Sequence, residues 1–350
     1  MSGSARSPIL AISDTEATFR GSRVRMDKRV RAQQAAAVEG EASSTQAAAR
    51  PPLADPRRGL LQRLSLDVER IAGIEITGPI QSKLARVLGS IDLAELEAWV
   101  ARLHLLPAHD PEWLSLIESL TVHETYFYRD RAQLDFLGSE ILPEIIVAAA
   151  ASGRCRLRLW SAGCATGEEA YTLAVLGLLA LCDAGYAEER ADRGIECRPP
   201  WTLEVLGTEI SRLVLVQARA AVYPMTGVGA FRDLPRRLER FFPPLPRAEE
   251  KPDIELRGVH PAVRRHISFE QFNLMSRLPP ATGFDVVLCR NVLIYLSAAA
   301  RRHVHGVLKQ ALRPGGFLLL GPTDVPAEPA LFTTCWGNGA AAYVLKLAHA

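Results

Sequence analysis

Residues Trp160–Tyr171 read WSAGCATGEEAY and directly follow an apolar, strand-like run, Leu157–Leu159. A strand that ends in a turn of small residues and passes straight into a helix is how parallel α/β folds hold a nucleotide-like cofactor. Gly163 and its small neighbours let the backbone approach a ligand closely. Glu168 and Glu169 open the predicted helix, at the positive end of its dipole. They would repel a phosphate but suit a cationic cofactor with hydroxyls, which favours S-adenosylmethionine over a dinucleotide.

Strands alternate with helices from about residue 121 to the end of the chain. The predicted strands are Leu157–Ser161, Leu203–Gly207, His266–Phe269, Phe284–Cys289, Gly316–Gly321 and Ala341–Leu345. The predicted helices between them are Glu168–Leu181, Ser211–Ala221 and Ser297–Leu312. An earlier helix is expected from Asp130 through Leu142, with an interruption at Pro143 and a continuation to Ala151. This alternation predicts a mostly parallel sheet with ligands at the carboxyl ends of its strands.

The length of 350 residues predicts about two domains. Residues 1–58 contain few large apolar side chains, so they are expected to form a disordered tail, or alternatively a basic tether to a partner or anionic surface. Residues 59–120 have apolar positions at spacings of three and four, which predicts a small helical domain. Residues 121–350 form the predicted catalytic domain. Prolines break the alternation at about 223–266, which predicts an inserted subdomain with an edge strand at Ile254–Arg257.

The composition excludes several classes of protein. The formal net charge of +2 gives no case for nucleic-acid binding. The six cysteines show no paired spacing, so we expect reduced thiols and no metal site. No apolar run is long enough to span a membrane, and the N-terminus lacks the apolar core of a secretion signal. The sequence therefore predicts a cytoplasmic protein without membrane insertion, and a monomer is the default expectation.

Further segments in this order carry a resemblance to a known family. They are Thr121–Asp130 (TVHETYFYRD), Trp160–Tyr171, Gly207–Ser211 (GTEIS), Phe272–Leu274 (FNL), Phe284–Leu296 (FDVVLCRNVLIYL) and Arg313–Gly321 (RPGGFLLLG). Over residues 59–350 the chain resembles the CheR family of chemotaxis-receptor glutamate O-methyltransferases. The resemblance implies an α/β, Rossmann-like S-adenosylmethionine-dependent methyltransferase fold with a small N-terminal all-helical domain and a small inserted β subdomain.

The resemblance also implies which residues bind S-adenosylmethionine, whose demethylated product is S-adenosylhomocysteine. The implied cofactor-binding residues are His123, Thr125, Arg129, Gly163, Glu169, Glu209, Asn273, Leu274, Cys289, Arg290 and Asn291. Glu169 would meet the cofactor's ammonium or a ribose hydroxyl through a charge-assisted hydrogen bond. The alternative for Glu169 is a helix-end charge without a ligand, the role that suits Glu168. Asn273 and Leu274 would flank the adenine.

Two of these positions depart from the family pattern. Glu209 ends the strand VLGTE, where an acid holds ribose hydroxyls and the family usually has Asp. Because Glu is one methylene longer, the ribose must lie slightly farther away or the backbone must shift. A solvated charge at the strand end is the alternative interpretation. His123 stands where Asn is usual, and protonation of its imidazole would make cofactor binding sensitive to pH.

Arg129 and Tyr295 are the implied catalytic residues. The planar guanidinium of Arg129 can hold a carboxylate bidentately, either the cofactor's or the acceptor's. Tyr295 lies four residues after Asn291, so one helical turn would bring its hydroxyl near the sulfonium; an aromatic side chain that caps the core is the alternative. A glutamate acceptor is already ionised near neutral pH and needs no general base, so alignment and exclusion of water would suffice. The sequence accordingly shows no Ser-His-Asp or metal constellation.

The resemblance implies a partner, the cytoplasmic helical region of a chemoreceptor. In the family a basic helix of the small domain meets that region, but the matching stretch Gln81–Ile91 has only Lys83 and Arg86 as basic residues. A methyltransferase that acts on a non-receptor signalling protein is therefore an alternative. His123 and Glu209 motivate another, a regulatory module that binds the cofactor without turnover. A nicotinamide-dependent oxidoreductase is disfavoured, because the turn lacks a G-x-G-x-x-G run.

Overall fold

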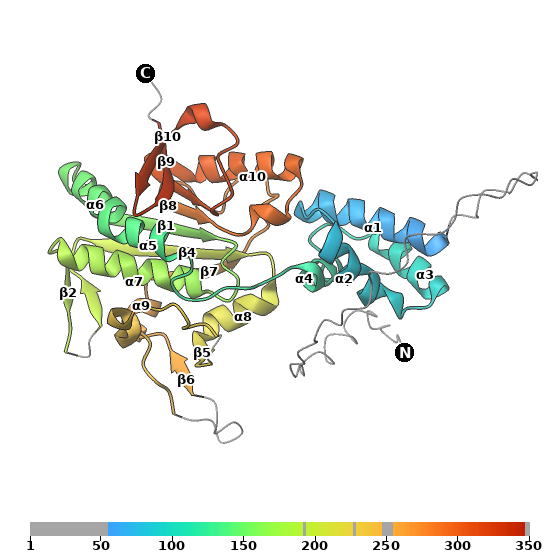
Figure 1. Cartoon of the computed structure of the whole chain (residues 1–350), viewed down its shortest axis with the longest axis horizontal. Helices are drawn as coiled ribbons and strands as arrows, with labels where there is room; N and C mark the ends of the chain where they lie inside the picture. Colours follow the sequence, from blue (N-terminus) through green and yellow to red (C-terminus); the bar gives the residue numbers. More distant parts are fainter. Residues whose placement is uncertain (1–54, 192–193, 227–228, 247–254, 347–350) are drawn as a thin grey trace, which may run out of the picture.

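A computed structural model describes residues 55–191, 194–226, 229–246 and 255–346 (Figure 1). Residues 1–54 of the predicted tail therefore lie outside the described residues. The described chain begins with four helices, α1 (Pro56–Ala72), α2 (Gly78–Gly89), α3 (Leu93–Leu103) and α4 (Pro111–Leu120). Aspartates cap three of them, because Asp55, Asp92 and Asp110 each accept a hydrogen bond from a backbone N–H of the first turn. These helices lie to one side of the sheet in Figure 1.

The predicted interruption at Pro143 is wrong. The helix continues from α5 (Arg131–Phe136) through a π-helical turn (Leu137–Ile141) into α6 (Leu142–Ala151). In the π turn the backbone N–H of Leu142 donates to the carbonyl of Leu137, five residues back. A proline lacks the N–H and crowds the carbonyl four residues before it. The wider turn accommodates both effects, so the helix does not break.

The sheet has seven strands in the order β10-β11-β9-β8-β1-β4-β7. Its parallel part consists of β1 (Arg156–Ala162), β4 (Thr202–Glu209), β7 (Ile267–Gln271), β8 (Phe284–Cys289) and β9 (Leu312–Leu320). The antiparallel part consists of β11 (Ala340–Leu345) and β10 (Phe332–Gly337). All six predicted strands are confirmed. The order of the strands reverses between β1 and β8, which is where open α/β sheets bind ligands.

The edge strand β10 was not predicted from the sequence. It pairs with β11 through a two-residue turn at Asn338 and Gly339, which both have positive φ (51° and 77°). Asn-Gly between two extended segments is the strongest short hairpin signal. This dipeptide could have predicted the strand. In Figure 1 the hairpin lies at the same end of the sheet as the C-terminus.

Helices cover both faces of the sheet and enclose two apolar clusters. On one face, α7 (Glu168–Asp183) and α8 (Arg212–Ala220) pack with α5 and α6 around Leu159, Val286 and Leu288. On the other face, α10 (Ala298–Ala311) and the four N-terminal helices enclose Trp160, Leu206 and Val287. The alternating side chains of the central strands thus serve both clusters, as expected for a parallel sheet buried on both faces.

An inserted subdomain is predicted at about 223–266, and these residues lie in the chain between α8 and β7. We call this part of the chain the inserted segment. It contains β5 (Val222–Pro224) paired with β6 (Leu256–Gly258), a short 3₁₀ helix η3 (Arg236–Phe241) and α9 (Pro261–Arg264). The predicted edge strand Ile254–Arg257 overlaps β6, and Ile254 lies outside the described residues. A second pair, β2 (Ala187–Glu189) and β3 (Ile195–Cys197), precedes β4 and was not predicted.

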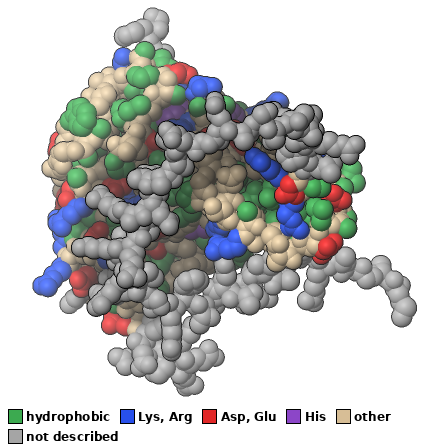
Figure 2. All heavy atoms as spheres, turned by 45° about the vertical axis from the view of Figure 1, so that its right-hand side comes forward, with side chains coloured by type: hydrophobic (Ala, Val, Ile, Leu, Met, Phe, Trp, Pro, Cys, Tyr) green, Lys and Arg blue, Asp and Glu red, His purple; other side chains and the backbone are tan. Residues whose placement is uncertain are grey.

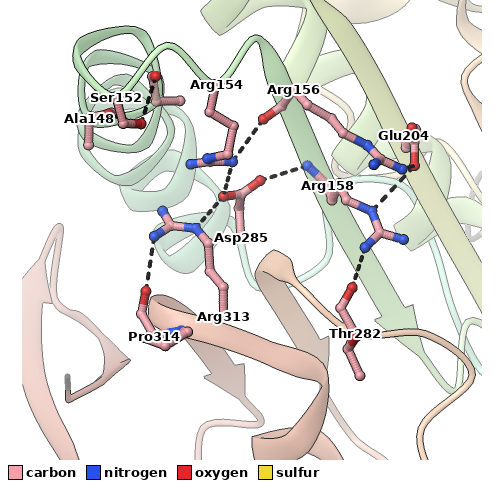
Figure 3. A network of polar contacts seen from close by, with 11 residues as sticks. Ala148, Ser152, Arg154, Arg156, Arg158, Glu204, Thr282, Asp285, Arg313 and Pro314 are labelled. Atoms are coloured by element: carbon pink, nitrogen blue, oxygen red, sulfur yellow. Dashed lines mark hydrogen bonds and ion pairs between the residues drawn. The ribbon is translucent and has the colours of Figure 1, made fainter. Parts of the chain in front are cut away.

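A buried carboxylate holds together the end of the sheet where the parallel strands begin (Figure 3). Asp285, fully buried in β8, accepts a hydrogen bond from the backbone N–H of Arg158 at 2.8 Å. It also receives the side chains of Arg313 (Nε–Oδ1, 2.5 Å) and Arg154 (Nη1–Oδ1, 2.8 Å). Since these partners come from β1, β9 and the turn before β1, one side chain connects three neighbouring segments.

Substitution of Asp285 by Ala should lower the free energy of unfolding by about 3 kcal/mol, because it removes a fully buried carboxylate that three partly buried donors share. Urea denaturation of the purified protein would measure this. The matched control is Glu204→Ala, which removes a half-exposed carboxylate that pairs with Arg156 and Arg158 in the same network. Exposed pairs contribute about 1 kcal/mol or less. Equal losses in the two variants would contradict the role assigned to burial.

Candidate functional site

A pocket opens where the carboxyl ends of β1, β4 and β8 meet the N-terminal helices. Its sheet side is formed by the loops that follow these strands, and its other side by residues such as Ala72, Ile80 and Leu120. The pocket lies at the reversal of strand order, as the topology predicts. Apart from Cys289, every residue predicted to bind the cofactor lines it, and so does Tyr295.

The turn after β1 allows close approach to the pocket. The backbone N–H groups of Gly163 and Cys164 donate to the carbonyl of Thr208 at 2.8 and 2.9 Å, which fixes the turn to the end of β4. Gly163 has φ 81°, a conformation that favours glycine. A Cβ at this position would lie 2.5 Å from Cγ2 of Val292. The absence of a side chain is therefore required by both the backbone conformation and the close packing of the next loop.

Glu169 and Arg290, which both line the pocket, form a buried ion pair. Arg290 Nε donates to Glu169 Oε2 at 2.7 Å, and the arginine side chain is 1% exposed. Ser161 Oγ donates to the other carboxylate oxygen at 2.6 Å. Arg290 Nη1 donates to the backbone carbonyl of Arg129 at 2.9 Å. Glu169 is therefore more than a helix-end charge, although protein donors already occupy part of its hydrogen-bonding capacity.

Glu209 is buried at the end of β4, so the alternative of a solvated charge is wrong. Its Oε2 accepts from the backbone N–H of Ala165 at 3.1 Å. Its Oε1 accepts from the N–H groups of Ile210 and Ser211 at 2.8 and 3.3 Å. These donors fix the orientation of the longer side chain toward the turn that follows β1. A carboxylate can accept about four hydrogen bonds, so capacity for a ligand hydroxyl remains.

Arg129 reaches the pocket from a segment with unusual backbone geometry. Its neighbours Tyr128 and Asp130 both have positive φ, 64° and 57°. Arg129 Nη1 donates to the carbonyl of Glu124 at 2.6 Å, and its guanidinium lies 5.7 Å from the ring centre of Tyr126. Positive φ at non-glycine residues is costly and persists only where surrounding contacts impose it. The bond from Arg290 to the Arg129 carbonyl is one such contact.

Tyr295 lines the pocket from a 3₁₀ helix, Leu293–Tyr295, rather than from the full α-helical turn expected after Asn291. Asn291 itself has φ 58°, which interrupts helical geometry directly after β8. The backbone carbonyl of Tyr295 accepts from the N–H of Glu75 at 2.9 Å. This bond joins the wall of the pocket to the segment between α1 and α2.

Asn273 is engaged by the protein through both ends of its amide. Its Nδ2 donates to the carbonyl of Ile71 at 2.7 Å, and its Oδ1 accepts from the N–H of Met275 at 2.9 Å. Asn273 therefore joins the loop after β7 to the end of α1. Leu274 and Thr125 line the same pocket.

His123 offers the pocket a buried polar atom without a partner. Among the described residues, none makes a hydrogen bond to its Nε2. Burial lowers the pKa of His123 below its usual 6.5; Lys83 lowers it further, whereas Glu209 and Glu118 raise it. A buried polar group without a partner is unfavourable. A ligand that offers a hydrogen-bonding group at this position would satisfy the imidazole.

The side chain of Cys289 is not among those that line the pocket. It is fully buried and packs in the apolar cluster with Trp160 and Val287. Burial raises the pKa of its thiol, which keeps it protonated. The structure therefore gives this side chain no place in the pocket, and cofactor binding by Cys289 stays a prediction. Side chains alternate along β8, so the last residue of the strand points into the core and the pocket begins at Arg290.

Glu168 is buried as well, which the sequence did not reveal. It is 3% exposed and accepts a hydrogen bond from Thr166 Oγ1 at 2.7 Å. Burial raises the pKa of Glu168 to about 7, against smaller opposing effects of that bond and of a backbone hydrogen bond. Of the two adjacent acids, only Glu169 lines the pocket. The position of Glu168 in the first turn of α7 is the only signal the sequence offered.

The pocket thus combines buried carboxylates, arginine side chains and a glycine-containing turn that a ligand can approach closely. Within the described residues, no group of three or more His, Cys, Asp or Glu side chains could hold a metal ion. None of the helices in the described ranges is both long and apolar enough to cross a membrane. Buried acids beside glycine suit a cationic, hydroxyl-bearing cofactor such as S-adenosylmethionine.

Comparison with known proteins agrees with this chemistry. A family described as "CheR methyltransferase, SAM binding domain" matches residues 123–337. Chemotaxis protein methyltransferase 1 of Pseudomonas aeruginosa is 32% identical over 213 residues, which cover 60% of this chain and 68% of that protein. A chemotaxis protein methyltransferase of Borreliella burgdorferi is 28% identical over 212 residues, which cover 60% and 67%.

A third relative has a different biological description. The probable biofilm formation methyltransferase WspC of Pseudomonas putida is 33% identical over 271 residues, which cover 76% of this chain and 55% of that protein. The similarity thus extends to proteins named for more than one signalling process.

Glu168→Gln should change how stability depends on pH. Burial raises the folded-state pKa of Glu168 to about 7, above the ordinary glutamate value of 4.5. Between these values the unfolded chain loses a proton that the folded protein keeps, so wild-type stability falls as pH rises. The loss should be on the order of 3 kcal/mol by pH 8. Glutamine does not titrate, so urea unfolding at pH 5 and pH 8 should show that the variant lacks this loss.

Glu97→Gln, which changes an exposed carboxylate of α3, is the control for that experiment. It should retain the pH dependence of the wild type. A Glu168→Gln variant that loses as much stability as the wild type between the two pH values would rule out the assignment.

His123 should make cofactor affinity sensitive to acid. The folded-state pKa is lowered, so the imidazole is neutral at pH 7 and becomes charged only on acidification. A charged imidazole would then repel a sulfonium ligand, partly offset by Glu209 and Glu118. Calorimetry should show S-adenosylmethionine binding that weakens several-fold as the pH is lowered past the usual imidazole pKa of 6.5 and the lowered pKa of His123 is reached. His123→Asn should flatten the profile, whereas His109→Asn, at an exposed site, should not; a flat wild-type profile would contradict this.

Proposed function

Because the chain belongs to the CheR methyltransferase family, which binds S-adenosylmethionine, we propose that it transfers a methyl group to glutamate carboxylates of a chemoreceptor. The observation that carries the proposal is a shared pocket. Arg129 and Tyr295, the implied catalytic residues, line the same pocket as Glu169 and Glu209. The same pocket therefore contains a cation suited to an acceptor carboxylate, Arg129, and two acids suited to a cationic methyl donor, Glu169 and Glu209.

The residues of the pocket suit the two ligands in different ways. We assign the donor's hydroxyls and ammonium group to Glu209 and Glu169, and its adenine to the region of Asn273 and Leu274. When bound, S-adenosylmethionine supplies an electrophilic methyl group. The fixed orientation of Glu209, through three backbone N–H donors, preorganises its side of the site.

The acceptor needs orientation more than activation. A glutamate has an unperturbed pKa of about 4.3 and is ionised at neutral pH, so no residue must remove a proton from it. Arg129 would hold one carboxylate oxygen while the other attacks, and Tyr295 would fix the direction of approach. The attacking oxygen forms a bond to the methyl carbon as the carbon–sulfur bond breaks, and the products are a glutamate methyl ester and S-adenosylhomocysteine. Charge is neutralised in this step, so exclusion of water favours it.

A second candidate acceptor is a signalling protein other than a chemotaxis receptor. Two observations favour keeping it. The stretch that would meet a receptor contains only Lys83 and Arg86 as cations, and Lys83 Nζ already donates to the carbonyl of Thr121 at 3.1 Å. A relative of 33% identity carries a biofilm-related description. A non-catalytic module that only binds the cofactor is the remaining alternative, and a turnover assay distinguishes it.

The test is transfer of tritium-labelled methyl from S-adenosylmethionine to purified cytoplasmic fragments of receptors and other signalling proteins encoded in the same genome. A glutamate ester should release its label as methanol in mild base. Arg129→Ala and Tyr295→Phe should each lower the transfer rate by about tenfold or more, about 1.4 kcal/mol in the barrier. Tyr186→Phe, at a ring stacked on Trp201 outside the pocket, is the control.

The outcomes separate the candidates. Label on receptor fragments supports the chemoreceptor assignment, and label only on another protein supports the second candidate. Cofactor binding with no label on any protein would support the non-catalytic module. Label that resists base would contradict an ester, and full activity of both variants would remove Arg129 and Tyr295 from the mechanism.

A further inference from the structure

Four arginines gather beside the segment that carries Arg129. Arg131 begins α5, and Arg232, Arg236 and Arg237 lie in and before η3 of the inserted segment; together they line a hollow of about 500 Å³. We call this set the arginine cluster. The backbone N–H of Phe127 donates to the carbonyl of Ala230 at 2.8 Å. This bond brings the inserted segment alongside residues 124–131.

The cluster has more cationic groups than nearby carboxylates. Arg131 and Arg237 share one carboxylate, Asp135, at 3.4 and 3.6 Å, and both side chains are 67% exposed. The same carboxylate accepts a 2.7 Å hydrogen bond from the hydroxyl of Tyr128. Each guanidinium has five N–H donors, so a single shared acid at these distances leaves most of them for another acceptor.

The remaining two arginines differ from each other. Arg232 pairs with Glu124 at 3.0 Å and lies 3.7 Å from the ring centre of Tyr126. Arg236 is exposed, and in the described ranges no carboxylate forms an ion pair with it. Asp233 also lines the hollow. Four cations thus face three carboxylates, Asp135, Glu124 and Asp233.

The cluster lies close to the pocket. The guanidinium of Arg129 is 5.7 Å from the ring centre of Tyr126, and that of Arg232 is 3.7 Å from the same centre. The two guanidinium carbons are therefore within about 10 Å of each other, which two or three residues of extended chain can span. An acceptor segment with its reacting carboxylate at Arg129 would place the following residues over the cluster.

We propose that the arginine cluster binds a second acidic side chain of the protein segment that is methylated. This inference rests on the proposed function, because it treats that function's acceptor as an acidic peptide. The charge surplus selects carboxylates, and the planar guanidinium groups suit them geometrically. On the face shown in Figure 2, Lys and Arg side chains are interspersed with apolar and other side chains rather than gathered in one patch. The cluster has four cations, whereas α2 has only Lys83 and Arg86. It therefore supplies a basic surface that α2 lacks.

The test uses a fluorescein-labelled peptide of ten glutamates and its glutamine counterpart, in fluorescence anisotropy at low salt with S-adenosylhomocysteine present. The variant is Arg236→Gln with Arg237→Gln. The control removes the same charge elsewhere, through Arg190→Gln with Arg198→Gln at the β2–β3 pair. The cluster variant should bind the glutamate peptide about tenfold more weakly, from two exposed pairs of about threefold each. The control variant should bind the glutamate peptide as tightly as the wild type. The glutamine peptide should bind weakly to every variant.

Three results would overturn the proposal: no glutamate-peptide binding by the wild type, equal weakening in the two double variants, or equal binding of the two peptides. Thermal unfolding and cofactor titration of the variants check that they fold. On any acceptor found in the labelling assay, the cluster variant should raise KM and leave kcat near wild type. If no carboxylate is ever methylated, the proposed function fails whatever the peptide does. If methylation occurs and the cluster variant behaves as the control, only this inference fails.

Discussion

The buried pair of Glu169 and Arg290 is the interaction on which the site depends. It joins α7 to the loop after β8, and through the carbonyl of Arg129 it also holds the segment before α5. Burying two charges is favourable only when geometry is good and the remaining polar atoms are satisfied. Ser161 and the Arg129 carbonyl meet that condition here. The position of the predicted acceptor-binding arginine is thus set by an ion pair beneath it.

Much of this arrangement could be predicted because it follows from local rules. Apolar runs bounded by turns predict the parallel strands, and their carboxyl ends must meet at one edge of the sheet. The small residues around Gly163 predict close approach, and the left-handed backbone at Gly163 and Gly167 explains the two glycines. The family resemblance predicted which loop residues belong to the site, and hydrophobic periodicity alone cannot predict this. Residues 121–130 are an example, because they form no strand or long helix.

Other features depend on tertiary packing, which local sequence does not show. Strand alternation directs the side chain of Cys289 into the core and away from the pocket. Pro143 was expected to break a helix, but a π turn accommodates it. Burial of Glu168 depends on how α7 packs against the rest of the protein, which the neighbouring residues in the sequence do not predict. The inserted segment's arginines also look like ordinary surface charges until the backbone bond between Phe127 and Ala230 places them beside Tyr126.

The wall of the pocket opposite the sheet comes from the N-terminal helices. Asn273 donates to a carbonyl in the last turn of α1, and the carbonyl of Tyr295 accepts from the segment just after α1. A molecule that fills the pocket therefore touches two parts of the chain at once. A ligand that binds only when the two parts are in contact stabilises that contact, and the stabilisation grows with the ligand's affinity and concentration. Occupancy then acts as a tether: the filled protein should resist separation of its N-terminal helices from its sheet more strongly than the empty one, and the release of product should loosen that attachment at the end of each cycle.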